Sequence, residues 1–597
     1  MTRKKVNLIH SPQVYYEQNQ GTHFIPIWAY TLSAYIPTDW DVKIFDLSCH
    51  PDISIPPADV FAFSGINQDF PSIQMAFQKL KTIYPQSVFV LGGPIVWSFE
   101  KDGRLGQLDF FDHLFVLDGE ETFPQFLQQL GRENSPKPEK IIRTERFSVE
   151  KAKKMRFDLL KQDADQYYGG VVEVSRGCPF LCEFCDIRVL PQNNEAHNKQ
   201  VDLIIEELDA YYRLGIRQIQ LACDNFIGDP VWADHCVDAI LAWVQKTGAR
   251  VALYTWLTVN ISKFPNLMIK MRKAGFNSLF IGVESFNANS ILETAKVQNH
   301  NDKNEMIEAL KHIQSFGFLV VPGLIFGFDN DRRSLFEDTL DGVLQSGLLG
   351  GDPTFLLALP GTPLYERMKR TGRLIEYHEG SDMVPLHKER VSKIETNIRY
   401  VQPHEFLVRG FMQFIKKFND ADYVYQRFER HVSLMMTSEH FIPSHSVGYG
   451  NLGQYLKFQF SSWSNFQKMF SRGFLFLHPR RFVTVLKGLW LVTRYFPKYP
   501  GLKNHFSIWL FFWSNLLIKY RDLKMEDFKI HSIDQGYDVE KIWNDSNYID
   551  TTLLASGRNP DNVKVADQSK RTKEAMARLR QNLNGKHPAD YFSKKAS

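Results

Sequence analysis

The sequence predicts an α/β protein with two successive domains built on parallel strands, followed by a mostly helical region. Two observations give this fold class. Up to about residue 375, short apolar runs alternate with stretches of helical spacing, a pattern typical of parallel sheets with helical crossovers. Beyond residue 400 only the helical spacing continues. The chain has 597 residues, which is long enough for several domains. We expect one domain over 1–140, a linker over 141–164, a second domain over 165–400, a helical domain over 401–555 and a polar tail over 556–597.

The first domain contains five apolar runs that we expect to be strands. They are residues 6–9, 42–45, 60–63, 88–91 and 113–117, and a segment of helical spacing at 73–83 lies between the third and fourth. This alternation predicts a doubly wound parallel sheet, in which ligands bind at the carboxyl ends of the strands. Two glycine-containing turns, Ser64-Gly65 and Gly92-Gly93, follow such ends. They let a ligand approach the backbone, although glycine pairs also form ordinary turns.

The second domain contains six apolar runs, each separated from the next by a helical segment. They are residues 171–174, 217–222, 251–256, 278–283, 319–326 and 354–359. Six units predict a partial (β/α)6 barrel rather than a closed eightfold one. Active residues of parallel barrels lie at the carboxyl ends of the strands. Polar or glycine residues follow three of these ends: Asp224-Asn225, Glu284-Ser285 and Gly327.

Three cysteines directly after the first barrel strand predict an iron–sulfur site. Cys178, Cys182 and Cys185 have the spacing Cys-x3-Cys-x2-Cys. Three thiolates can hold three irons of a 4Fe–4S cluster and leave the fourth iron open to another ligand, whereas four cysteines would close every iron. Structural zinc needs a fourth ligand, and His197 is the only histidine nearby. A disulfide is disfavoured because nothing marks the chain as secreted.

The cysteine motif resembles that of the radical S-adenosylmethionine (SAM) enzymes. The resemblance implies that Cys178, Cys182 and Cys185 bind a 4Fe–4S cluster whose open iron chelates SAM. Electron transfer in that superfamily cleaves SAM to a 5′-deoxyadenosyl radical, which abstracts a hydrogen atom from the substrate. Phe184 occupies the family's aromatic position before the third cysteine, near the adenine. The resemblance also implies an external electron donor such as flavodoxin or ferredoxin.

Further positions resemble family elements that contact SAM. Asp224 and Asn225 begin an Asp-Asn-Phe element, and Glu284 with Ser285 matches a contact to the ribose or methionyl end. Gly323 and Gly327 resemble glycines beside the adenine. Carboxylates suit SAM because it carries a sulfonium and an ammonium. An acidic residue after a strand is often only a helix cap, so each position is weak evidence alone.

Together with the radical SAM motif, the first domain resembles the Rossmann-like cobalamin-binding domain of cobalamin-dependent radical SAM proteins. The resemblance implies that Ser64, Gly65, Gly92 and Gly93 contact cobalamin. The family's Asp-x-His-x-x-Gly motif is absent, since His50 falls two places late after Asp46, which argues against a histidine as the lower cobalt ligand. The alternative is a Rossmann-like domain that has lost its ligand. The similarity to the subfamily of hopanoid-modifying enzymes extends over about residues 1–400.

The expected activity is cobalamin-dependent methylation of an unactivated carbon in a small-molecule, lipid-like or secondary-metabolite substrate. Two alternatives stay open. One is a radical rearrangement or cyclisation without methyl transfer. The other, from a different class, is a non-catalytic metal-cluster protein that docks on membranes. Product analysis separates the first two, and release of 5′-deoxyadenosine separates an enzyme from a binding protein.

The helical region contains an unusual basic and aromatic segment over residues 470–524. Aromatic and aliphatic runs alternate there with Lys and Arg, and Asp522 is the only acidic residue. Such a segment suits a helix lying in an anionic membrane surface, but it also suits helices packed over the barrel with basic side chains reaching outward. No apolar run is long enough to span a bilayer. With a net charge of only +4 and no signal peptide, we expect a cytoplasmic protein, peripheral to the inner membrane face under the first alternative, and no nucleic-acid partner.

Overall fold

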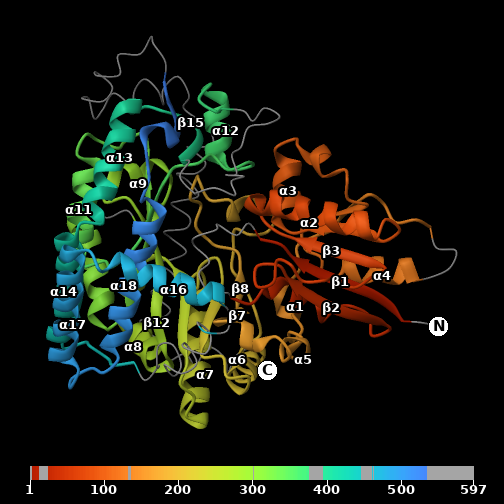
Figure 1. Ribbon diagram of the computed structural model, residues 1–597, viewed down its shortest axis with the longest axis horizontal. Coiled ribbons are helices and arrows are strands. Elements are labelled where there is room, and N and C mark those ends of the chain that lie inside the picture. The colour runs from red at the N-terminus through yellow and green to blue at the C-terminus, as the bar shows by residue number, and fades with distance from the viewer. Residues whose placement is uncertain are drawn as a thin grey trace. The chain divides into compact units, whose positions relative to one another are not determined.

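The computed structural model describes residues 3–12, 24–131, 136–299, 302–375, 394–444, 460 and 463–533. They form two compact units (Figure 1). The first unit contains most of the chain up to residue 173 together with residues 197–219. The second contains residues 174–196 and most of the chain after residue 220. The domain limits expected above stay a prediction, and the tail at 556–597 lies outside the described residues.

The first unit is built on a six-stranded parallel sheet with the strand order β2-β1-β3-β4-β5-β6. Its strands are β1 (Lys4–His10), β2 (Trp40–Asp46), β3 (Val60–Ser64), β4 (Val88–Gly92), β5 (His113–Val116) and β6 (Ile141–Arg143). All five expected strands are present. The sixth, β6, pairs with β5 and begins the segment expected to be a linker. Sequence patterning missed it because it is short, lies at the edge of the sheet and has no fully buried residue.

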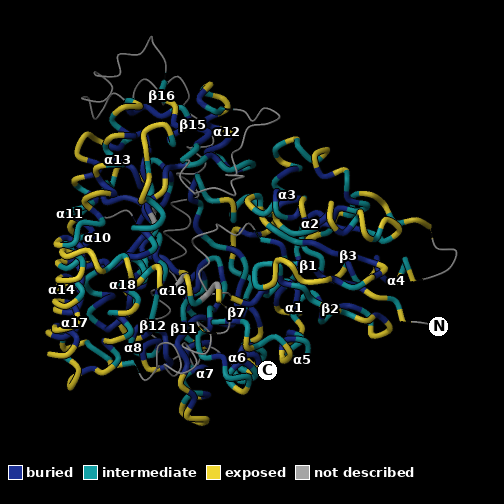
Figure 2. The backbone as a smooth tube through the Cα atoms, viewed as in Figure 1, coloured by how far each residue is buried: buried dark blue, intermediate teal, exposed yellow. Residues whose placement is uncertain are grey.

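Side-chain alternation along these strands places a hydrophobic core on each face of the sheet. In β3, Phe61 and Phe63 belong to the core covered by α2 (Phe70–Ile83) and α3 (Pro94–Lys101). Val60 and Ala62 point to the opposite core, which α1 (Ile27–Ser33) and α4 (Thr122–Gly131) cover. Figure 2 shows the strands as the buried centre of this unit. The two cores make the unit doubly wound, which brings every loop after a strand to the same edge.

The second sheet also has six strands, in the order β14-β13-β12-β11-β10-β7. They are β7 (Gly169–Glu173), β10 (Gln218–Ala222), β11 (Ala252–Leu257), β12 (Phe276–Glu284), β13 (Leu319–Phe326) and β14 (Asp352–Phe355). The pairings from β11 through β14 are parallel. The intervening helices are α6 (Val201–Arg213), α7 (Pro230–Thr247), α8 (Pro265–Ala274), α10 (Lys303–Ser315) and α11 (Leu335–Ser346), with the short α9 (Ala288–Glu293). The expected six strands are confirmed, although β14 ends four residues earlier than its apolar run.

After the barrel the chain becomes mainly helical. The elements are α12 (Pro363–Arg370), α13 (His404–Phe418), α14 (Ala421–Thr437), α16 (Trp463–Leu475), α17 (Pro479–Tyr495) and α18 (Leu502–Lys519), with the paired strands β15 (Ile394–Tyr400) and β16 (Phe528–Ser532). Thr362 caps α12 by accepting a hydrogen bond from the Tyr365 N–H, as its sequence predicts. A core of α14, α17 and α18 includes Trp509, stacked 4.5 Å from Phe428. Every described helix is too short or too polar to cross a membrane.

Candidate functional site

The three predicted ligand cysteines lie in the loop that follows β7. Cys182 is buried, Cys178 and Cys185 are partly buried, and all three are free thiols. The Cys185 N–H donates to the Cys182 carbonyl (3.2 Å), so a tight turn brings these two residues together. The pKa of Cys185 is raised by burial first and then by its proximity to Cys182 and Cys178. The three thiols therefore lie within electrostatic reach of one another.

The thiols of this loop need a cationic partner to ionise. Burial raises the pKa of Cys178 to about 12 and raises that of Cys182 as well. Iron–sulfur ligation requires thiolates, and bound iron supplies the compensating positive charge. Among the described residues, no three His, Cys, Asp or Glu side chains are arranged around one metal ion. A cubane cluster instead places each thiolate on a different iron, which lets the sulfur atoms stand farther apart.

The start of the cysteine loop is held by the residues that follow β10. Gly177 has a φ of +88°, and a Cβ atom there would lie 2.0 Å from the Glu195 carbonyl oxygen, so only glycine fits. Its N–H donates to Asp224 Oδ2 (2.6 Å). Asn225 directs its amide nitrogen at Cys178 Sγ (3.9 Å). Asp224 and Asn225, predicted as SAM contacts, thus lie against the cysteine loop and orient its backbone.

Glu284 ends β12 in a backbone conformation unusual for a residue other than glycine. Its φ is +61°, and its side chain is buried. Such a conformation costs roughly 1–3 kcal/mol and persists where the surroundings impose it. Glu284 Oε1 accepts from Lys296 Nζ (2.6 Å), and this ammonium lies 5.8 Å from the ring centre of Phe184. The neighbouring Ser285 uses its hydroxyl locally, accepting from the Asn287 N–H (3.1 Å).

The two predicted glycines of β13 and its following turn have different surroundings. At Gly323 a Cβ atom would lie 3.4 Å from Glu284 Oε2, so this glycine faces the carboxylate of Glu284, which is a predicted SAM contact. Gly327 has a φ of +97°, and a Cβ atom there would lie 2.5 Å from the Tyr400 ring. Gly327 is therefore required by the turn and by the packing of Tyr400.

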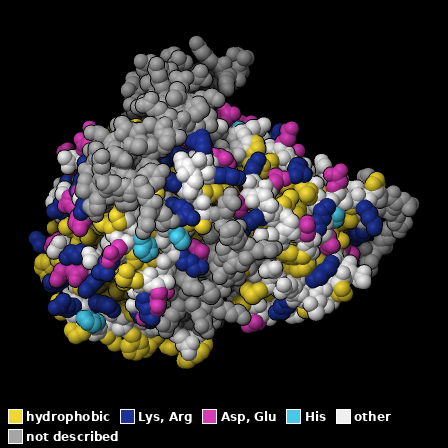
Figure 3. Space-filling model, turned by 90° about the horizontal axis from the view of Figure 1, so that it is seen from above, with side chains coloured by type: hydrophobic (Ala, Val, Ile, Leu, Met, Phe, Trp, Pro, Cys, Tyr) yellow, Lys and Arg dark blue, Asp and Glu magenta, His cyan; other side chains and the backbone are white. Residues whose placement is uncertain are grey.

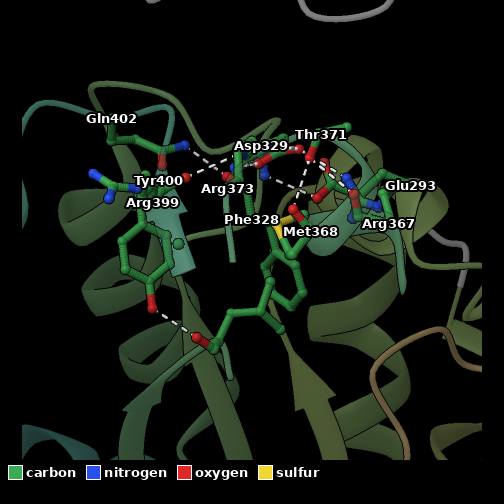
Figure 4. Close-up of polar contacts among 12 residues, drawn as sticks. Glu293, Phe328, Asp329, Arg367, Met368, Thr371, Arg373, Arg399, Tyr400 and Gln402 are labelled. Atoms are coloured by element: carbon green, nitrogen blue, oxygen red, sulfur yellow. Dashed lines mark hydrogen bonds and ion pairs between the residues drawn. The ribbon is translucent and has the colours of Figure 1, made fainter. Parts of the chain in front are cut away.

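A buried ionic network fixes the middle of the cysteine loop to α12 (Figure 4). Arg367 donates two hydrogen bonds to the Glu183 carboxylate (2.7 and 2.9 Å) and a third to Asp329 Oδ2 (2.9 Å). Arg373 contacts both oxygens of Asp329 (2.7 and 2.6 Å). Burial alone would raise the pKa of Asp329, but Arg373 and Arg367 hold it below its ordinary value. Glu183 lies between Cys182 and Phe184 in the sequence, so the network holds the cysteine loop in place through Arg367 of α12.

The buried carboxyl group of Asp331 is expected to make the stability of the protein depend on pH. The residue is buried, and its carboxylate accepts from Ser290 Oγ (2.7 Å) and from the Gly327 and Phe328 N–H groups (2.8 and 3.0 Å). Burial raises its pKa from 3.8 to about 7. The native state then holds this proton more tightly than the unfolded state does, so the free energy of unfolding decreases as the pH rises from 3.8 to about 7. A difference of three pKa units corresponds to about 4 kcal/mol.

We expect Asp331→Asn to remove this decrease, because an amide does not ionise. Anaerobic urea unfolding at several pH values across that window measures the effect for both proteins. The difference in unfolding free energy between variant and parent should move in favour of the variant as the pH rises. Parallel curves for the two proteins would show that another group governs this part of the profile.

Several neighbouring residues escaped the sequence prediction. Lys296 pairs with Glu284, and Gln298 donates to Cys182 Sγ (3.3 Å). Both follow α9, outside any recognisable motif. Glu183 lies inside the cysteine motif, but nothing in the sequence indicates that its partner is Arg367. No local sequence pattern indicated these residues.

The predicted residues of the first unit lie in the loops after β3 and β4. Gly93 has a φ of +86°, and a Cβ atom there would lie 2.4 Å from Ser64 Oγ and about 3 Å from the Gly65 backbone. The Ile95 N–H donates to the Gly65 carbonyl (3.0 Å). The two turns thus pack directly on each other, and at Gly93 glycine is required by that packing. The structure brings Ser64, Gly65, Gly92 and Gly93 together at one edge of the sheet.

Comparison with known protein families shows which family the second sheet and its cysteine loop resemble. The radical SAM superfamily matches residues 172–343, which include the cysteine loop and the strands through β13. This segment of the chain is a radical SAM domain. The radical SAM segment is followed by a match to a domain of unknown function, DUF4070, over residues 362–499.

Relatives and solved structures extend this comparison. The hopanoid C-2 methylase of Rhodopseudomonas palustris is 29% identical to this chain over an alignment that covers 63% of this chain and 68% of the methylase. The bacteriochlorophyllide d C-12(1)-methyltransferase of Chlorobaculum tepidum is 25% identical over 33% of this chain and 41% of its own. The cobalamin-dependent radical enzyme OxsB shares 14% identity, with a TM-score of 0.53 over 96% of this chain and 84% of its own. At that identity the likeness to OxsB concerns the fold.

The prediction of a radical SAM enzyme with a 4Fe–4S cluster and SAM as cofactors is confirmed. The cysteine loop fits the cluster, because its three free thiols lie close enough to influence one another's pKa and burial disfavours their ionisation without a bound metal. The individual residue assignments stay predictions. Of the expected set, Cys178, Cys182, Cys185, Asp224, Asn225 and Glu284 lie in one connected group, whereas Ser285 and Gly327 have local structural roles.

Proposed function

We propose that the protein is a cobalamin-dependent radical SAM methyltransferase that methylates an unactivated carbon of a lipid-like or secondary-metabolite substrate. One observation carries the proposal. The chain contains both the cysteine loop and a doubly wound unit whose ligand-binding edge has buried polar atoms without a hydrogen-bond partner among the described residues. The methylase names of the relatives support it. When bound, the cluster supplies the electron that cleaves SAM, and cobalamin supplies the methyl group.

The cobalamin part of the proposal rests on the first unit. In the strand order β2-β1-β3, the switch point lies between β1 and β3, where doubly wound sheets bind their ligands. Three buried polar atoms in the segments after β3, β4 and β5 have no hydrogen-bond partner among the described residues: Asn67 Oδ1, Trp97 Nε1 and Thr122 Oγ1. Buried polar atoms are nearly always hydrogen-bonded, so unpartnered ones at this edge fit a ligand rich in amide groups.

The sequence argument against a histidine as lower cobalt ligand is supported by the surroundings of His50. This residue follows β2 at the edge of the sheet, and its Nε2 atom lies 2.8 Å from Gln166 Oε1. Asp46 meanwhile accepts from the Ser48 N–H and hydroxyl (2.9 and 2.6 Å). Both side chains therefore have protein partners, and we propose that cobalamin binds through the turns at Ser64-Gly65 and Gly92-Gly93 without a His50 ligand.

In the second unit we propose that Glu284 positions SAM. Its Oε1 atom is engaged by Lys296, which leaves Oε2, on the side of Gly323, to accept from the ammonium or a ribose hydroxyl of SAM. Phe184 would pack beside the adenine, and Asp224 and Asn225 would hold the cysteine loop. An external donor such as flavodoxin or ferredoxin would supply the electrons. Within this proposal, residues 1–140 hold cobalamin and 165–400 hold the cluster and SAM.

Isotope transfer tests the proposed function. With SAM deuterated in its methyl group, reductant and a substrate lipid fraction, we expect the label in an extracted product, together with 5′-deoxyadenosine. Mass spectrometry measures both. Omission of cobalamin should stop label transfer. Release of 5′-deoxyadenosine with an unlabelled, altered product would instead identify a rearrangement or cyclisation.

A further inference from the structure

Two consecutive helices of the second unit expose large apolar side chains to solvent. More than half of the exposed large hydrophobic residues in the described chain lie between residues 460 and 496. Figure 2 shows exposed stretches along α17, and in the space-filling view of Figure 3 hydrophobic side chains gather along the lower edge. Contiguous apolar surface of this kind marks an interaction site in a folded protein.

Helix α17 separates a packing face from an exposed apolar face. Its packing face includes Gly488, where a Cβ atom would lie 2.7 Å from the Trp509 ring, so α17 and α18 approach closely. Phe482, Leu486 and Trp490 lie four residues apart on the opposite face, with exposed fractions of 47%, 48% and 58%. The exposed row therefore contributes little to holding α17 in place.

Helix α16 repeats this arrangement. Trp463, Phe470 and Phe474 are 70%, 54% and 58% exposed, and the last two rings lie 5.3 Å apart. The helix is attached to α18 by Arg472, which donates to Asn515 Oδ1 (2.6 Å). As in α17, a row of aromatic rings stays outside.

The charge on these two helices and on the chain segments that flank them has one sign. The sequence contains no Asp or Glu from residue 440 to residue 521. Arg480, Lys487 and Arg494 of α17 are exposed beside its apolar row. A basic border around aromatic and aliphatic side chains complements an anionic, partly apolar surface.

This charge distribution favours an anionic occupant over two basic ones. The polar tail at 556–597 carries more Lys and Arg than Asp and Glu, so it would bring like charge to the basic border. A second copy packed through the same face would do so as well, because a two-fold contact presents identical patches to each other. An anionic lipid headgroup layer over acyl chains matches both the charge and the apolar row.

We infer that α16 and α17 form an interfacial face that docks the enzyme on an anionic lipid bilayer. The aromatic and aliphatic rows enter the boundary between headgroups and acyl chains, while Arg480, Lys487 and Arg494 contact the headgroup phosphates. Docking needs no spanning helix. If the proposed methyl transfer holds, the enzyme draws its substrate from the bilayer, and this consequence alone rests on the proposed function.

Vesicle flotation of the full-length holoprotein tests the docking face. We expect the protein to float with vesicles of mixed phosphatidylcholine and phosphatidylglycerol, to bind pure phosphatidylcholine vesicles less, and to be released by added salt. The triple variant Phe482→Ser, Leu486→Ser, Trp490→Ser should lower the bound fraction at least about tenfold, since binding scales with buried apolar area. The variant Lys487→Gln, Arg494→Gln should weaken binding only to the anionic vesicles.

A matched control replaces exposed apolar residues of the first unit. Met75→Ser and Ile83→Ser alter side chains that are each 55% exposed on α2, and flotation should be unchanged. Circular dichroism checks that the triple variant keeps its helices. Equal flotation of parent and triple variant would overturn the inference, and so would absence of vesicle binding with self-association through this face. Flotation reads lipid binding alone, so a failure of methyl transfer would not mimic a negative result.

Discussion

Replacing Cys182 with Ala is expected to abolish reductive cleavage of SAM. Two thiolates cannot hold a 4Fe–4S cluster that keeps one iron open for SAM, and without that cluster SAM receives no electron from it. Since enzymes accelerate reactions by about a millionfold or more, losing the cofactor should bring 5′-deoxyadenosine formation below detection. Chromatographic measurement of 5′-deoxyadenosine after dithionite reduction gives the rate, and iron and sulfide analysis gives the cluster content.

Cys236→Ala provides the matched control. Cys236 is fully buried in α7 and lies outside the cysteine loop, so its replacement removes a sulfur atom of similar burial without touching the ligand set. Its cluster content and SAM cleavage should match those of the parent protein. A full complement of four irons in Cys182→Ala would refute the assignment of this residue.

Replacing Arg367 with Met should be the most destabilising single change near the site. The substitution leaves Glu183 and Asp329 buried with one guanidinium fewer, and removing one partner of a buried ion pair costs about 3–5 kcal/mol. We expect a loss of unfolding free energy of this size in anaerobic denaturant titrations. Because Glu183 lies within the cysteine loop, iron content after reconstitution should fall as well.

A surface ion pair supplies the comparison for Arg367. Arg409 and Glu405 form a pair on α13, where both side chains are more than 60% exposed. Arg409→Met should cost less than about 1 kcal/mol and leave iron content unchanged. If Arg367→Met and Arg409→Met proved equally mild, the buried network would not be what supports the loop.

Most of the fold could be predicted because its signals are local. The strands of both sheets are short apolar runs with period-two alternation, and in β3 this alternation separates Phe61 and Phe63 from Val60 and Ala62. The cysteine motif is local as well, with three ligands within eight residues. The start of α12 followed from Thr362 and Pro363 alone. Strand β6 was missed because its three residues, two of them partly buried and one exposed, carry no such pattern.

The supports of the site could not be predicted because they join distant parts of the chain. Glu183 and Arg367 are separated by 184 positions, and only the barrel fold brings them together. Lys296 was invisible for another reason. Lysine is usually exposed, and its burial beside Glu284 depends on the backbone turn at a φ of +61°. No pattern of residue types in the sequence predicts that turn.

The ionic network of Figure 4 also bears on what constitutes the working unit of this enzyme. The segment that matches the radical SAM superfamily ends at residue 343, and it supplies the acidic side chains Glu183 and Asp329. Both guanidinium groups come from further along the chain, at Arg367 and Arg373. The radical SAM segment thus contains buried carboxylates whose positive partners lie outside it. The chain downstream of residue 343 supplies those partners, so the two segments form one structural unit.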